Sequence, residues 1–83
     1  MDRPTKYISD YVREKGINLT KLSKKTGIPY FSIYDSLLNK KRDRDLRVGE
    51  YLEICTFLGV DPMDFADQPN EMRDKTLDYT ERR

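Results

Sequence analysis

The 83-residue chain has no histidine, no tryptophan and a single cysteine. Without histidine the commonest metal ligand and general base is missing, and one cysteine cannot form a disulfide within the chain. No apolar run is long enough to span a membrane, and no signal-peptide pattern follows Met1. No glycine-rich phosphate loop or nucleophile beside a base is present either. We therefore expect a cytoplasmic protein that is not an enzyme, with no cofactor, no metal and no evident small-molecule ligand.

The charge of the chain is unevenly distributed. Residues 1–48 carry 12 Lys or Arg against 6 Asp or Glu, whereas residues 49–83 carry 4 against 9, so that the net charge of +1 conceals a basic half and an acidic half. A basic half of this kind favours a polyanionic partner and would orient the molecule on it. The alternative is a solvated surface whose asymmetry arose by chance. At 36% hydrophobic residues the chain can form one modest core.

Residues 18–38 (NLTKLSKKTGIPYFSIYDSLL) predict two short helices joined by a tight turn. The side-chain oxygen of Asn18 can cap the first helix, and Gly27 can end it in the left-handed conformation. Pro29 suits the first turn of the second helix, and Ser23 is small enough for the two helices to cross closely. This pattern is typical of a helix-turn-helix, whose second helix commonly enters the major groove of DNA.

Apolar spacing and end signals predict helices over about 5–15, 19–26, 30–38 and 48–58, and a short fifth helix that opens at Asp61. We expect the core to contain Tyr7, Ile8, Tyr11 and Val12 from the first helix, and Val48, Leu52, Cys55 and Leu58, with part of Tyr51 and Ile54, from the fourth. Cys55 is expected to be a small buried apolar residue and not a nucleophile, since no base is available to activate it.

Residues 6–65 resemble the Cro/Xre-type, λ-repressor-like helix-turn-helix family of phage and bacterial regulators. The matching segments are INLTKLSKKTGI, the anchoring Ile33, and LRVGEYLEICTFLGVDPMDF. The resemblance implies an all-α fold, a compact bundle of about five helices, forming a DNA-binding domain over residues 1–66. It also implies a sequence-specific transcriptional regulator, a small repressor that occludes a promoter as a homodimer. Residues 67–83 form a charged tail that we expect to be disordered or marginally helical, or else ordered on a partner subunit.

The third helix is the candidate for reading bases in double-stranded DNA. A helical wheel places Tyr30, Phe31, Tyr34 and Asp35 outward. None of these is Arg, Lys, Asn or Gln, the residues that make bidentate base contacts, so we expect weaker readers: aromatic faces on thymine methyl groups, tyrosine hydroxyls, and Asp35 accepting from cytosine. Two alternatives remain. Tyr30 and Phe31 could pack against the second helix or a loop, or the face could bind a protein, as in an antirepressor or regulatory subunit.

The phosphate contacts that the resemblance implies come from the second and third helices and from the basic loop that follows, and they are Thr20, Lys21, Ser32, Lys40, Lys41, Arg42 and Arg44. The alternative is a solvated loop whose charges pair locally. Family members often have a glutamine where this chain has Leu19, which weakens a side-chain phosphate contact there. In the family the fifth helix often forms the dimer contact, and Met63 is our candidate for it.

Overall fold

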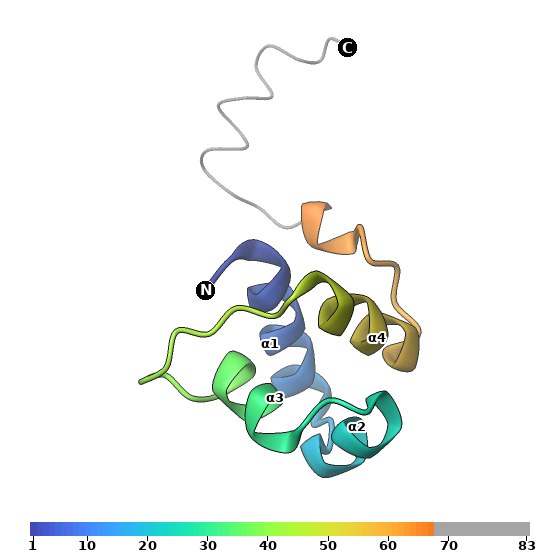
Figure 1. Cartoon of the computed structure of the whole chain (residues 1–83). Helices are drawn as coiled ribbons and strands as arrows, with labels where there is room; N and C mark the ends of the chain where they lie inside the picture. The colour runs from blue at the N-terminus through green and yellow to red at the C-terminus, as the bar shows by residue number, and fades with distance from the viewer. Residues whose placement is uncertain (68–83) are drawn as a thin grey trace, which may run out of the picture.

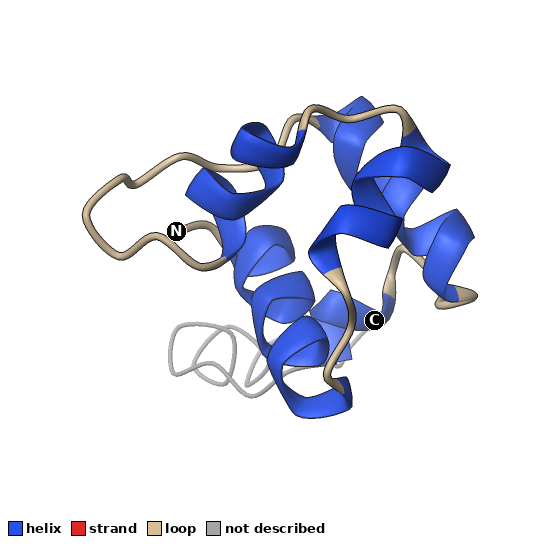
Figure 2. Cartoon of the chain, turned by 90° about the horizontal axis from the view of Figure 1, so that it is seen from below, coloured by secondary structure: helices blue, strands red, loops and turns tan. Residues whose placement is uncertain are grey.

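Within residues 1–67, the part of the chain that it describes, the computed structural model contains four α-helices, one short 3₁₀-helix and no strand (Figure 1, Figure 2). They are α1 (Arg3–Lys15), α2 (Leu19–Thr26), α3 (Tyr30–Leu37), α4 (Val48–Leu58) and η1 (Asp64–Asp67). The predicted all-helical class is confirmed. The expected fifth helix is the four-residue η1, which begins three residues after Asp61. From residue 68 on, the predicted tail lies outside the described residues.

Local sequence signals fix where the helices begin and end. The Lys21 amide donates to Asn18 Oδ1 at 3.0 Å, as the capping signal predicts. Gly16 and Gly27 end α1 and α2 with φ of 66° and 80°, a region that a Cβ disfavours. Asp2 caps α1 through the Thr5 amide, at 2.9 Å. The sequence analysis missed that cap, and α1 consequently begins two residues earlier than predicted.

The core lies between the four helices: α2 packs against both α3 and α4, α1 packs against α3, and η1 packs against α1. Its buried apolar side chains are Ile8, Val12, Leu19, Leu22, Ile28, Ile33, Leu37, Leu46, Tyr51, Ile54 and Cys55. Two small polar residues of α1 are buried with them. Ser9 Oγ donates to the Leu37 carbonyl at 2.6 Å, and Thr5 Oγ1 accepts from the Leu46 amide at 2.9 Å. These bonds satisfy the Leu37 carbonyl at the end of α3 and the Leu46 amide in the loop before α4.

The predicted core face of α4 is wrong at two positions. Val48 and Leu52 are 76% and 44% exposed, whereas Tyr51, Ile54 and Cys55 are buried. Apolar residues occur on more than one side of α4, so the sequence alone did not indicate which side of this helix faces the core. The structure sets it along the 51, 54, 55, 58 stripe, which follows the i, i+3, i+4, i+7 spacing.

On α1 the predicted apolar stripe is only partly buried. Tyr7 and Tyr11 are half-buried at its edge, while Ile8 and Val12 are buried as expected. Burial of Thr5 and Ser9 turns the helix so that its small residues, and not its tyrosines, meet the rest of the core. Small side chains at a crossing allow the helix axes to approach closely, and large rings move to the edge.

The two ends of the molecule are built from different elements. In Figure 1, α2 and α3 lie at the bottom and η1 lies at the top, with α1 between them. η1 is attached to the start of α1, because Arg3 Nη2 donates to the carbonyls of Phe65 and Ala66 at 3.3 and 3.4 Å and its guanidinium lies over the Phe65 ring. The long connection between α3 and α4 passes beside the N-terminus in both views (Figure 1, Figure 2).

Candidate nucleic-acid interface

The outward face of α3 carries a cluster of aromatic rings. Phe31 is 75% exposed, and Tyr30 and Tyr34 are 39% and 37% exposed, while Ile33 and Leu37 of the same helix are buried. The ring of Tyr30 stacks on that of Tyr34 at a centroid distance of 6.4 Å and meets the edge of Phe31 at 5.4 Å. The three rings therefore pack against one another and still leave a large apolar surface in water, which suits a contact with another molecule.

Asp35 lies at the border of this face and already has partners. Its Oδ1 accepts from Asn39 Nδ2 at 3.0 Å, and its Oδ2 lies 3.9 Å from Arg42 Nη2. Sequence reasoning identified Asp35 as a base reader but did not find Asn39, four residues on along the same helical line, as its partner. A base amino group would have to compete with both donors, so Asp35 is a weaker candidate reader than the tyrosines.

Three hydrogen bonds fix the turn that joins α2 to α3. Ser23 Oγ donates to the Ile28 carbonyl at 2.6 Å. Thr26 Oγ1 donates to the Leu22 carbonyl at 2.7 Å and accepts from the Ile28 amide at 3.3 Å. Ser23 thus does more than leave room for the crossing that its size predicted, because its hydroxyl ties α2 to the start of α3. The orientation of the aromatic face relative to α2 is set by these bonds.

The loop between α3 and α4 is held against the N-terminus. The Met1 amine is 2.8 Å from Asp43 Oδ1, and the Asp2 amide donates to Asp45 Oδ1, also at 2.8 Å. The hydrogen bond from Asp43 raises the pKa of the Met1 amine against the opposing effect of desolvation. The two carboxylates that interrupt the basic run are therefore directed toward the N-terminus, which leaves the lysines of the loop as its outward charges.

Arg44, predicted to bind phosphate, is turned into the domain. Its Nη1 donates to the Ser32 carbonyl at 3.2 Å and to Ser36 Oγ at 2.5 Å, and its Nη2 donates to Glu50 Oε2 at 2.9 Å. The guanidinium therefore links the loop to both α3 and α4. Sequence reasoning could not separate Arg44 from its basic neighbours, because its partners come from two helices.

Glu50 completes this link. Its Oε1 accepts from the Arg47 amide at 2.9 Å at the start of α4, while Oε2 is bound by Arg44. Burial would raise the pKa of Glu50, but the hydrogen bonds from Arg44 and the Arg47 amide outweigh that effect and hold the pKa below its usual value. Glu50 is therefore ionised at neutral pH and acts as both the helix cap and the counterion of Arg44.

The remaining predicted phosphate contacts lie before and after the aromatic face along the chain. Thr20 and Lys21 are exposed in the first turn of α2, and Lys40, Lys41 and Arg42 are exposed in the loop. Within residues 1–67, no ion pair involves Lys21, Lys40 or Lys41. Lys24 and Lys25 at the end of α2 are also exposed cations. Ser32 is half-buried, and its carbonyl is bound by Arg44.

Other predicted features lie away from α3. Met63 is 64% exposed just before η1, at the far end of the molecule (Figure 1). Cys55 is buried, as predicted, and burial raises the pKa of its thiol. No group of three metal-ligating side chains occurs in the described part of the chain. None of the helices described there is long and apolar enough to cross a membrane.

Comparisons of the chain with protein-family models, with curated proteins and with solved structures each gave no match.

Proposed function

We propose that this protein is a sequence-specific DNA-binding transcriptional regulator in which α2 and α3 form a λ-repressor-like helix-turn-helix. The observation that carries the proposal is the position of the exposed aromatic face of α3 between two sets of exposed cations in the chain, on α2 and on the loop after α3. A helix that presents its side chains to a groove needs cations on either side to contact the flanking phosphates. The protein acts by occluding a promoter and carries out no chemistry.

In this arrangement the contacts fall into two groups. Lys21, Lys40, Lys41 and Arg42 neutralise phosphates, and Thr20 with the first amides of α2 adds hydrogen bonds to them. The aromatic rings of α3 contact base edges and thymine methyl groups. Arg44 acts within the domain, since its donors hold the loop against α3 and α4. Affinity thus comes mostly from the lysines and sequence preference mostly from the rings.

A homodimer completes the proposal. One recognition helix reads only a few base pairs, whereas two copies whose helices lie one helical turn apart, at ~34 Å, read a site twice as long. The exposed Met63 at the acidic end is the proposed subunit contact. Sedimentation at tens of micromolar and on a palindromic duplex tests this part: Met63→Asp should lower the dimer fraction, while Lys15→Asp, which makes the chain more acidic at the end of α1, should not. A parent chain that stays monomeric in both settings would contradict it.

The main test is selection of random duplex DNA by the purified protein at two salt concentrations. A regulator of this kind should enrich one sequence, palindromic if it binds as a dimer, and lose affinity as salt rises. Tyr34→Ala should then weaken binding to the enriched sequence more than to unrelated DNA, with an unchanged thermal melt as the control. Enrichment of no sequence at either salt concentration would exclude sequence-specific recognition.

A second candidate is a protein-binding module on the same fold. It is favoured by the large exposure of Phe31 and by the pairing of Asp35 with Asn39, since exposed aromatic clusters are common centres of protein interfaces. In that case Tyr30→Ala and Tyr34→Ala would leave DNA binding weak and independent of sequence while they abolish capture of a partner from a cell lysate. The DNA proposal instead expects a parent chain that binds DNA specifically, and variants that lose this specificity without a change in capture from the lysate. One pair of variants therefore separates the two proposals.

A further inference from the structure

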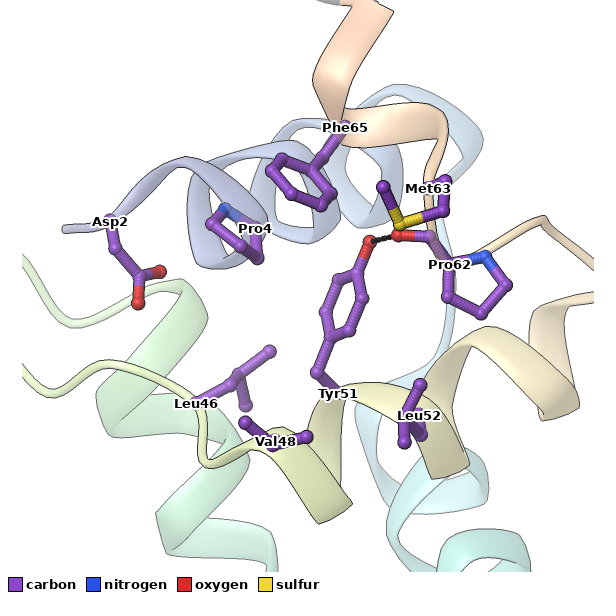
Figure 3. A pocket seen from close by; sticks show the side chains of 9 residues that line it. All are labelled: Asp2, Pro4, Leu46, Val48, Tyr51, Leu52, Pro62, Met63 and Phe65. Atoms are coloured by element: carbon purple, nitrogen blue, oxygen red, sulfur yellow. Dashed lines mark hydrogen bonds between the residues drawn. The ribbon is translucent and has the colours of Figure 1, made fainter.

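An apolar cleft of about 270 Å³ lies at the end of the molecule away from the proposed DNA contact (Figure 3). The start of α1, the start of α4 and residues 62–65 surround it, and its lining includes Asp2, Pro4, Leu46, Val48, Tyr51, Leu52, Pro62, Met63 and Phe65. Tyr51 rises from α4 with its hydroxyl donating to the Pro62 carbonyl at 2.5 Å, and its ring meets that of Phe65 edge to face. The hydrogen bond and the ring contact of Tyr51 thus hold two walls of the cleft, α4 and residues 62–65, together.

The side chains around the cleft leave apolar surface in water. Val48, Leu52 and Met63 are 76%, 44% and 64% exposed and all three line it. Apolar side chains that gather at the mouth of a cleft differ from scattered surface residues, because one occupant can remove them from water together. Neither the core nor the proposed DNA contact uses this surface.

The chain itself supplies an occupant within reach. The described residues end at Asp67, two residues after Phe65 of the cleft wall, and 68–83 follow. Half of that segment is charged, but it contains Leu77 and Tyr79, two largely apolar side chains close together. The nine residues 68–76 can span ~30 Å when extended, which is enough to reverse and return to the cleft. A tether of this length gives an effective concentration of about millimolar, so a contact within one chain is favoured over one between chains.

Charge also favours this occupant. Residues 49–67 contain no Lys or Arg, and Asp61, Asp64 and Asp67 lie on the segment that carries Met63 and Phe65. Arg82 and Arg83 follow Tyr79 closely in the sequence. Asp78 and Glu81 make residues 77–83 neutral overall, so the attraction comes only from placing the two arginines near these aspartates, and it adds to the burial of apolar surface.

We propose that Leu77 and Tyr79 occupy the cleft of their own chain and cover Val48, Leu52 and Met63. The segment then competes with a second copy for the face that contains Met63, which makes dimer formation dependent on its release. This inference uses the cleft and the sequence of residues 68–83 and does not depend on DNA binding. It can therefore fail or succeed separately from the proposed function.

The absence of tryptophan provides a sharp test in the full-length chain. In Tyr79→Trp the single tryptophan should emit at shorter wavelength than in the adjacent control Thr80→Trp and should be less accessible to acrylamide. Neighbouring residues of an extended segment point to opposite sides, so the control reports the same segment outside the cleft. Adding Leu52→Asp should return the Tyr79→Trp emission to that of exposed tryptophan, with circular dichroism confirming that the fold is intact.

The concentration dependence identifies the source of the occupant. A blue shift that is already present at low-micromolar protein, where a second copy is scarce, supports docking within one chain. A shift that develops only as concentration rises assigns the cleft to a second copy and overturns the proposal, as does exposed emission throughout.

A second measurement avoids the added tryptophan, because its side chain could be too large for the cleft and give a false negative result. With ¹³C-methyl methionine the chain has only three labelled sites. In otherwise unmodified protein the Met63 methyl should show nuclear Overhauser contacts to Leu77 or Tyr79, and these should be lost in Leu77→Ser but kept in Thr76→Ser. No such contact, or contacts found only between differently labelled chains, would contradict docking within one chain.

Discussion

The two ends of the molecule both hold their exposed segments by hydrogen bonds but leave different side chains in water. At the basic end, which comprises α2, α3 and the loop to α4, hydrogen bonds and ion pairs fix the turn and the loop. At the acidic end, which comprises α4 and η1, Arg3 and Tyr51 donate to backbone carbonyls of residues 62–66, and an apolar rim stays uncovered within the described residues. The difference teaches that the same small core supports one exposed surface rich in cations and one rich in apolar side chains.

The loop at the basic end is held by partners on other elements of the molecule. Asp43 and Asp45 contact the first two residues of the chain, and Arg44 reaches Glu50 on α4. Hydrogen bonds in which one partner is charged are stronger than neutral ones, and here they also place the lysines outward. A loop that is held in this way loses less entropy on binding, which is the physical advantage of a preformed contact surface.

The largest effect is expected from Arg44→Ala, which tests whether the basic end is held by this link. The change leaves the Glu50 carboxylate half-buried without its counterion, and the free energy of unfolding should fall by about 2 to 3 kcal/mol. Urea unfolding measures it. Lys41→Ala is the matched control, with an expected change within about 0.5 kcal/mol because Lys41 is exposed. Equal stability of the two variants would show that Arg44 is a surface residue, as the sequence prediction had it.

Next in size is Ser23→Leu, which tests the crossing of α2 and α3. The larger side chain overpacks the turn and removes the bond to the Ile28 carbonyl, so we expect a loss of about 2 kcal/mol, read from thermal melts. Lys24→Leu adds a similar side chain at the exposed neighbouring position and should change stability little. A parent-like melt for Ser23→Leu would mean that the turn is not a close contact.

A smaller effect follows from the pKa of Glu50. Because its pKa is lowered in the folded state, ionised Glu50 stabilises the fold above its unfolded pKa, and this contribution is lost as the pH falls through the folded pKa. Glu50→Gln should therefore cost about 1 to 2 kcal/mol at pH 7 and less near pH 3, which lies below the unfolded pKa. Unfolding of both proteins at the two pH values measures the difference. A cost that does not vary with pH would argue against the ion pair.

The smallest effect on stability is expected for the double variant Lys40→Ala, Lys41→Ala, which tests the outward charges of the loop. Its stability should match that of the parent, because neither lysine is ion-paired within residues 1–67. Binding to any duplex should weaken, and the slope of log affinity against log salt should fall by about 2. The pair Lys6→Ala, Lys15→Ala on α1 is the control. An unchanged slope in the loop variant would remove the loop from the DNA contact.

Much of the architecture could be predicted because its signals are local. Asn18, Gly16 and Gly27 each act within one helical turn, so the ends of α1 and α2 follow from a few neighbouring residues. The outward position of Tyr30, Phe31 and Tyr34 followed from the burial of Ile33 and Leu37 on the other side of a short helix. The assignment of these residues to DNA stays a prediction until binding is measured.

What could not be predicted depends on how separate elements pack against one another. Val48 and Leu52 were placed in the core because α4 offers several apolar directions, and only its packing against the other helices selects one. Arg44 resembles its basic neighbours in sequence, but Ser36 and Glu50 draw it inward. The cleft is lined both by Asp2 and by Phe65, from opposite ends of the described part of the chain, which no local pattern indicates.

The sequence by itself thus determined the helical class, most helix ends and the division between a basic and an acidic half, because propensity, capping and charge are properties of neighbouring residues. Tertiary structure alone decided which face of α4 is buried, which cations remain free to bind and where an apolar cleft opens. The physical reason is that burial and ion pairing are settled by the three-dimensional approach of segments such as α1 and residues 43–46, which lie about forty residues apart.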